Sequence, residues 1–151
     1  MRNRRQTLQH SWAVATLLGT AGWLPFNAMA FDKAAFEAKS MAAALQALGA
    51  SAPVPSKDVT LIGPEIADSG ASVMFAFGTS LPHVKRLFLF VEKNPATLVA
   101  SFQLSPAVES QFSLRIKMSQ SSDVYAVALL EDGKTYFAKR EVKVTLGGCG
   151  E

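Results

Sequence analysis

From residue 57 onward, the sequence alternates apolar and polar residues in a series of short segments. The clearest case has an apolar residue at every second position: Phe112, Ser113, Leu114, Arg115, Ile116, Lys117 and Met118. A period of two sends successive side chains to opposite faces of a β-strand, whereas a helix requires apolar spacings of three and four. Short strands at roughly 8–12-residue spacing are typical of two packed antiparallel sheets. This feature therefore predicts an all-β domain.

The predicted strands are either alternating or continuously apolar. They occupy residues 59–62, 73–77, 87–91, 98–104, 112–118, 124–130, 135–138 and 142–146. Asp132-Gly133 is a hairpin signal between two of them. In the last one Val142, Val144 and Leu146 share a face, so we expect the chain to be anchored in the domain up to Leu146. We predict an immunoglobulin-like β-sandwich of about seven strands. Its core is expected to contain the phenylalanines at 75, 77, 88, 90 and 112.

One helix is predicted ahead of the strands, over residues 32–49. Asp32 can cap its start, and Gly49 followed by Pro53 ends it. An apolar stripe at helical spacing is formed by Met41, Ala44, Leu45 and Leu48. We expect this helix to pack on its own domain.

Residues 1–30 have the pattern of an export signal. Three arginines precede a short apolar run, and Ala28-Met29-Ala30 is a signal-peptidase site. The adjacent Arg4-Arg5 suggests the twin-arginine route. We expect cleavage after Ala30, a mature helix-plus-sandwich body over residues 31–146 and a tail over residues 147–151, in a bacterial periplasm.

Removing the leader changes the charge. All three leader charges are arginines, so lysine plus arginine falls from 15 to 12, against 12 acidic residues. The mature chain is formally neutral, which gives no support to nucleic-acid or anionic-membrane binding.

The tail carries the chain's one cysteine, Cys149, between Gly147, Gly148 and Gly150. One cysteine forms no internal disulfide, so this thiol is free, joined to another molecule or chemically occupied. The bland interpretation is a frayed terminus with an accidental cysteine. The specific one is an arm: glycines leave the sulfur sterically bare, and five residues beyond Leu146 extend by roughly 16–18 Å.

An enzyme requires the opposite arrangement, with a fixed thiol beside a base or a positive charge. The nearest charges here are Glu151 and the terminal carboxylate, which disfavour the thiolate. The tail therefore predicts a carried group, with no catalytic residue in the chain.

Other chemistry finds little support in the sequence. His83, the one histidine of the mature chain, follows Pro82 and has no cysteine or histidine at metal-ligand spacing, so we expect no metal and no cofactor. No nucleophile elbow is present. Four charged residues are predicted to be solvated or at an interface: Arg115, Lys117, Glu131 and Asp132.

Several segments together resemble one family. They are LQALGA at 45–50, GPEIADSGA at 63–71, SLPHVKRLFLFVEKNP at 80–95, ASFQLSP at 100–106, RIKMSQSSDVYAV at 115–127, DGKTYFAKREVKVT at 132–145 and the GGCG ending. The chain resembles the SoxY family, the sulfur-carrier subunits of the bacterial thiosulfate-oxidising Sox system.

The resemblance implies an immunoglobulin-like fold, a heterodimer with a SoxZ subunit and covalent attachment of the cargo to Cys149. It also implies three partner enzymes: the haem enzyme SoxAX, which joins thiosulfate to the cysteine; the manganese hydrolase SoxB, which removes sulfate; and, in many species, a sulfane dehydrogenase. Family tails usually end GGCGG, and Glu151 replaces the last glycine here.

Two other functions remain open from the residues. One is a periplasmic assembly module whose cysteine forms only an intermolecular disulfide. The other is a sulfurtransferase, which the lack of positive charge around the thiol disfavours.

Overall fold

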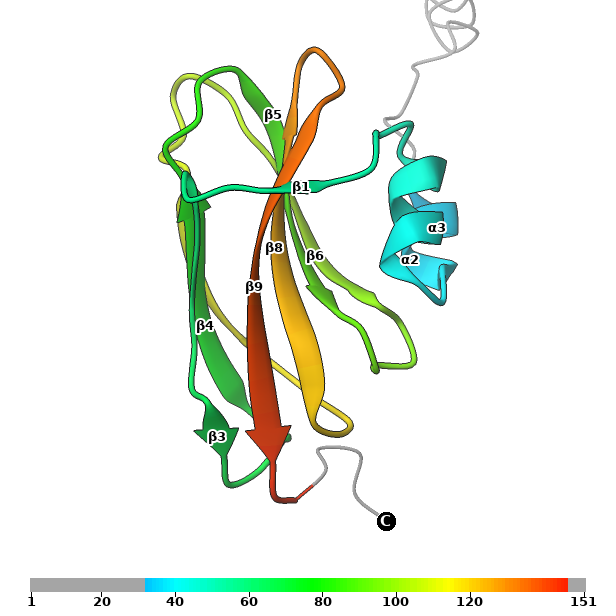
Figure 1. The fold of residues 1–151 in the computed structure, drawn as a ribbon, viewed down its shortest axis with the longest axis vertical. Helices are drawn as coiled ribbons and strands as arrows, with labels where there is room; N and C mark the ends of the chain where they lie inside the picture. Colours follow the sequence, from blue (N-terminus) through cyan, green and yellow to red (C-terminus); the bar gives the residue numbers. More distant parts are fainter. Residues whose placement is uncertain (1–31, 147–151) are drawn as a thin grey trace, which may run out of the picture. The chain divides into compact units, whose positions relative to one another are not determined.

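The computed structural model describes residues 32–146, in which two short helices precede nine strand segments (Figure 1). The helices are α2 (Lys33–Glu37) and α3 (Met41–Ala47). The strands are β1 (Val54–Pro55), β2 (Val59–Ile62), β3 (Ile66–Ala67), β4 (Val73–Thr79), β5 (Val84–Val91), β6 (Leu98–Gln103), β7 (Gln111–Ile116), β8 (Ser122–Leu130) and β9 (Thr135–Val144). β1 and β3 have two residues each, so the prediction of about seven strands is confirmed.

The strands form two sheets. The large sheet has the order β1-β9-β8-β5-β6, and β3 also pairs with β9; the small sheet has the order β2-β4-β7. Pairing is antiparallel except along the outer edge of β9, where β1 and β3 both run parallel to it. Two facing sheets of this kind make the predicted immunoglobulin-like sandwich.

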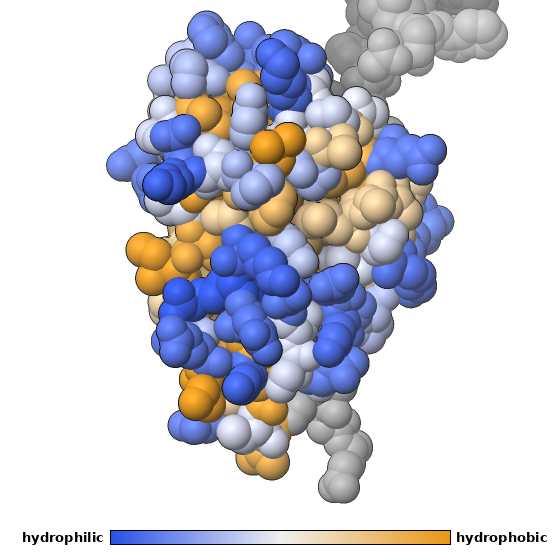
Figure 2. Space-filling view, viewed as in Figure 1, coloured by the Kyte–Doolittle hydropathy of each residue, from blue (hydrophilic) through white to orange (hydrophobic). Residues whose placement is uncertain are grey.

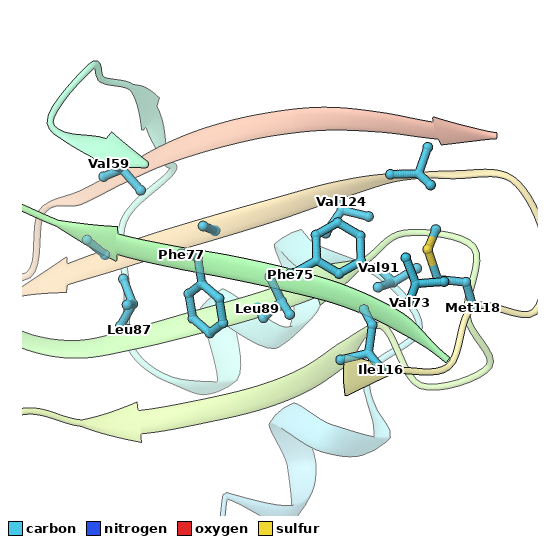
Figure 3. Packing of buried hydrophobic residues seen from close by; sticks show 13 residues of the cluster. Val59, Val73, Phe75, Phe77, Leu87, Leu89, Val91, Ile116, Met118 and Val124 are labelled. Atoms are coloured by element: carbon cyan, nitrogen blue, oxygen red, sulfur yellow. The ribbon is translucent and has the colours of Figure 1, made fainter. Parts of the chain in front are cut away.

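The main core lies between the sheets (Figure 3). Its buried members alternate with outward-facing residues along their strands, as the period of two predicts: Val59, Val73, Phe75, Phe77, Leu87, Leu89, Val91, Ile116, Met118, Val124, Ala126, Ala128 and Val142. Phe112 is only half-buried, where it stacks on Phe102 with ring centroids 4.1 Å apart. Phe112 therefore packs against the edge of the core, so the prediction that it is a core residue is only partly confirmed.

A second core lies on the other face of the large sheet, beneath the helices. It contains Ala35, Ala44, Leu45, Phe88, Phe90, Leu98, Val127 and Leu129. The continuous apolar run 87–91 is now explained: its odd residues enter the main core, while Phe88 and Phe90 meet the helices. A strand buried on both faces has no polar side to show.

The prediction of one helix over residues 32–49 was wrong, because the chain breaks it in two. Ala38 is extended, with φ −62° and ψ 138°, and Ser40 starts α3 by accepting a 3.2 Å hydrogen bond from Ala43 N. A serine favours such an N-cap over a helix interior. The predicted end is confirmed: Gly49 has φ +67° and the hydrogen bonds of a Schellman cap.

Asp32 does not cap α2 through its side chain. Its carboxylate instead forms an ion pair with Arg86 of β5, which ties the start of the body to the large sheet. Local capping preferences cannot anticipate this contact, because Arg86 lies 54 residues away in sequence.

The last two predicted strands, 135–138 and 142–146, are joined in one ten-residue strand, β9, which ends at Val144, two residues earlier than predicted. It is joined to β8 by the predicted turn, in which Gly133 has φ +83°. Among the described residues, no helix has the length and apolar character that crossing a membrane requires.

Candidate functional site

The predicted attachment residue, Cys149, and its neighbours Gly147, Gly148 and Gly150 lie outside the described residues. The structure describes the residues that immediately precede the tail and the loops around them. That surface, the tail root, is formed by Val144, Thr145 and Leu146 and by the two loops that contact them, residues 65–71 and 117–122.

The first loop is hydrogen-bonded to the chain at Lys143 and Thr145. Lys143 N donates to Glu65 O at 2.9 Å, and Thr145 N donates to Ala67 O at 3.0 Å. Thr145 Oγ1 donates to Asp68 O at 2.6 Å. The parallel pairing of β3 with β9 is thus continued past the last strand residue.

Gly70 completes this attachment. Its N–H donates to Leu146 O at 2.7 Å, and its own carbonyl accepts from Met118 N at 2.8 Å. The backbone is therefore hydrogen-bonded to the body as far as Leu146, through a loop and not through the predicted strand. The Leu146 side chain, however, does not share the core face with Val142: it is 68% exposed.

The second loop contacts the opposite side of the chain end through Ser121. Val144 N donates to Ser121 Oγ at 2.8 Å, and this hydroxyl lies 3.3 Å from Val144 O. A hydroxyl that both donates and accepts can satisfy two backbone groups at a strand end.

Asn94 holds this second loop in place. Its Nδ2 donates to Lys117 O at 2.8 Å, and its Oδ1 accepts from Ser119 N at 3.0 Å. Asn94 belongs to the VEKNP segment, Ser119 to RIKMSQSSD and Gly70 to GPEIADSGA. Three segments that are distant in sequence therefore meet at the tail root.

Two of the charged side chains that lead along β9 toward the tail root are paired. Lys139 Nζ lies 2.7 Å from Asp123 Oδ2 and 5.7 Å from the centroid of the Tyr125 ring. The hydrogen bond to Asp123 raises the pKa of Lys139. Arg140 lies 3.4 Å from Glu65, whereas Lys143 has no ion pair among residues 32–146.

Two shallow grooves lie beside these charges. One, of about 470 Å³, is lined by Glu65, Ile66, Lys139, Arg140, Glu141 and Lys143. The other, of about 280 Å³, is lined by Lys93, Ser121, Ser122, Asp123, Lys139 and Glu141. Carboxylates and cations alternate in both, so neither is a strong site for a free anion.

The remaining residues singled out from the sequence lie away from the tail root or point into solvent. His83 is exposed in a turn at the other end of the sandwich, with Nδ1 3.9 Å from Glu131 Oε2. Asp132 pairs with Lys134 at 2.8 Å, which lowers the pKa of its carboxyl group. Arg115 and Lys117 are exposed, as predicted. Within the part of the chain described, no three potential metal ligands come together.

Sequence reasoning missed the residues that fix the tail root, namely Gly70, Asn94, Ser121 and Thr145. Small polar residues and glycines in loops give no local sign of which strand they will contact. The available signal was their position inside the segments that resemble the family, since those segments meet here.

A protein-family profile described as "Sulfur oxidation protein SoxY" matches residues 44–149. The match covers most of the chain and ends on Cys149. The chain belongs to the SoxY family. No sequence among the curated proteins matches it.

Solved structures agree with this SoxY assignment. The sulfur carrier protein SoxY from Chlorobium limicola f. thiosulfatophilum is 34% identical, with a TM-score of 0.63 over 71% of this chain and 97% of that one. A superoxide reductase (neelaredoxin) variant from Ignicoccus hospitalis is 17% identical, with a TM-score of 0.50 over 57% of this chain and 78% of that one. The second likeness concerns the sandwich fold alone.

Proposed function

We propose that this SoxY-family chain is a covalent carrier of thiosulfate-derived sulfur, attached at Cys149. The observation that carries the proposal is where the hydrogen bonds between the C-terminal segment and the body stop. The backbone is hydrogen-bonded to the body through Leu146, and Cys149 follows only three residues later. The Chlorobium relative is itself described as a sulfur carrier.

The attachment step is an oxidation. The thiol of Cys149 and the outer sulfur of thiosulfate form a disulfide, giving Cys–S–S–SO₃⁻, and release one proton and two electrons. The proposed carrier has no redox group of its own. The two electrons released in this step therefore pass to a haem enzyme of the SoxAX type. Water then cleaves the sulfonate, catalysed by a SoxB-type manganese hydrolase, which leaves a persulfide on Cys149 and releases sulfate.

The thiol does not act as a catalyst in this cycle. Catalysis requires a nucleophile held beside its base, and three glycines flank this cysteine. We propose that the partner enzymes supply the activation, including a sulfane dehydrogenase that oxidises the persulfide. A SoxZ-like subunit completes the carrier, and the complex works in the periplasm after removal of residues 1–30.

The test is the intact mass of the mature chain after incubation with thiosulfate and the conjugating enzyme. The wild-type chain is expected to gain one thiosulfate-derived group, and Cys149→Ser is expected to gain none. An adduct of the same mass on Cys149→Ser would refute attachment at this residue.

The glycines separate this function from simple disulfide formation. Proline at position 147 or 148 fixes φ and stiffens the arm. Gly148→Pro is expected to slow enzymatic loading while leaving the disulfide with a second copy unaffected. Equal loading of both proteins would favour an assembly module instead.

A further inference from the structure

One edge of the large sheet has no neighbouring strand. β6 is the terminal strand of that sheet, and among residues 32–146 it pairs with β5 alone. Ser101 and Gln103 are exposed on it, while Val99, Ala100 and Phe102 are half-buried. The described part of the chain therefore leaves most of this edge open.

The backbone of β6 presents unpaired groups along this edge. Leu104 N donates to Lys85 O at 3.0 Å, so the backbone of Leu104 faces β5. In an antiparallel pair, successive residues point their N–H and C=O groups alternately toward the neighbour and away from it. The backbone of Phe102 therefore also faces β5, whereas Ser101 and Gln103 point theirs outward. Outward groups of this kind are a template for one more strand.

β6 also lacks the features that usually protect such an edge, which are charges, prolines, short strands and covering segments. Residues 94–108 contain no charged side chain, and no proline or glycine interrupts residues 96–105. The other edges are protected: β1 and β3 lie along β9, β2 has only four residues, and β7 contains Arg115. Figure 2 shows hydrophilic side chains gathered over the lower half of the side that β9 crosses.

The sequence of β6 suits pairing with a second copy of itself. Two identical strands related by a two-fold axis must be self-complementary. With the axis at Ser101, this residue faces its own copy, and Ala100 faces Phe102 of the second copy. A small side chain thus meets a large one, and no charge faces its like.

We propose that β6 pairs with β6 of a second copy of this chain, antiparallel and centred on Ser101. Backbone hydrogen bonds between the two Ser101 residues join the strands, and the large sheets of the two copies become continuous. Each copy uses its one unprotected edge, so association stops at two copies. The contact area of two short strands is small, which makes the dimer weak and reversible.

The direction of β6 keeps the two tails apart. β9 runs toward the tail root, and each step from β9 to β8, β5 and β6 reverses the direction. β6 therefore starts at the tail-root end, where Asn94, just before it, bonds to Lys117 and Ser119. Because the paired β6 strands are antiparallel, the two tail roots lie at opposite ends of the dimer. The dimer forms without a disulfide through Cys149, and it does not depend on the carrier function.

The test is sedimentation equilibrium of the mature chain at low ionic strength, with a reductant that removes any disulfide through Cys149. The wild type is expected to dimerise as its concentration rises. Ser101→Lys and Ser101→Glu each set like charges against each other across the axis, so each is expected to raise the dimer Kd about fivefold. An equal mixture of the two variants brings opposite charges together and is expected to return the Kd to the wild-type value or below.

The matched control is the same pair of changes at Thr60, an exposed residue of β2 on the other sheet. Thr60→Lys and Thr60→Glu are expected to leave the Kd unchanged, alone and mixed. The complex with the partner subunit is expected to contain two copies of the chain and to respond to the Ser101 variants in the same way.

Amide hydrogen exchange of the wild type provides a measurement that needs no variant. Exchange at Ser101 and Gln103 is expected to slow as the protein concentration rises. A wild type that remains monomeric up to about 1 mM would overturn the proposal. So would a mixture of the Ser101 variants that associates no better than either alone. Loss of the partner subunit from the Ser101 variants would assign the edge to that subunit instead, which also overturns it.

Discussion

The outer faces of the two sheets differ in how they are protected from water. On the large sheet, Phe88 and Phe90 point outward and are fully buried beneath α2 and α3. On the small sheet, five outward side chains are exposed and Ala76 is half-buried; the exposed ones are Thr60, Ile62, Met74, Ser113 and Arg115. In Figure 1 the helices lie beside the large sheet, away from β4. The helices therefore cover the face that carries the two phenylalanines, whereas Ile62 and Met74 on the other face stay exposed.

The largest expected effect comes from truncating a side chain on the covered face, which tests whether that face contributes more to stability than the open one. Phe88→Ala is expected to lower the free energy of unfolding by about 3–5 kcal/mol, because it leaves a cavity between β5 and the helices. Urea denaturation of the mature chain measures this. Met74→Ala on the open face is the control and should change stability by less than about 0.5 kcal/mol. Similar losses for both variants would contradict the distinction.

A smaller effect tests whether the open face tolerates change everywhere. A Cβ atom at Gly78 would lie 2.5 Å from the Gln111 side chain and 2.5 Å from the backbone oxygen of Ser110. Gly78→Ala is therefore expected to destabilise the domain by about 1–3 kcal/mol through overpacking. Combining it with Gln111→Ala should recover only part of the loss, since the Ser110 backbone remains; full recovery would show that only the side chain matters.

The attachment of the helices to the covered face can be weakened without touching its core. Asp32→Ala leaves Arg86 without its carboxylate partner, and Arg86 is mostly buried. We expect a loss of about 1–2 kcal/mol, again measured by denaturation. Lys33→Ala removes the exposed 3.6 Å pair with Glu37 and should cost less than about 0.5 kcal/mol. Equal effects would mean that the pair with Arg86 adds nothing beyond a surface contact.

The smallest effect concerns the margin of the covered face, where Tyr125 packs half-buried against Phe137 with centroids 5.7 Å apart. Burial raises the pKa of Tyr125 above its ordinary value of 10.0. The unfolded chain therefore loses this proton at lower pH than the folded one, so stability contributed by the neutral phenol is complete below pH 10 and is lost as pH rises through the raised pKa.

Denaturation curves above and below pH 10 for the wild type and Tyr125→Phe isolate this contribution. The wild type is expected to lose more stability on the alkaline side than the variant. Identical pH dependence would show that the phenol is not desolvated.

Much of the sandwich could be predicted from the sequence, because its strands carry their own pattern. The alternation at 112–118 and the Asp132-Gly133 turn are local signals, and both recur in the structure. The helix over residues 32–49 was predicted too long because apolar spacing continues across Ser40, and only the capping bond reveals the break.

The site was predictable to a different degree. A lone cysteine among glycines is visible without any structure, and so is the end of the alternation at Leu146. The bonds from Gly70, Ser121 and Asn94 were not, because each joins segments more than twenty residues apart through groups that many loops possess. The apolar alternation predicts that Leu146 faces the core, but its side chain is exposed because β9 ends two residues earlier, at Val144.

The two-residue strands β1 and β3 have a consequence for colloidal behaviour. A long terminal strand with a bare flank invites copies of itself to add on, the route to fibrils. Here Ser56 N meets Phe137 O at 3.0 Å and Lys143 N meets Glu65 O at 2.9 Å, so both ends of the outer flank of β9 are occupied. The stretch between them bears Lys139 and Glu141. In an in-register stack of copies, each of these side chains would face the same residue of the next copy, and like charges repel. We therefore expect copies of the chain not to add strands along the β9 edge.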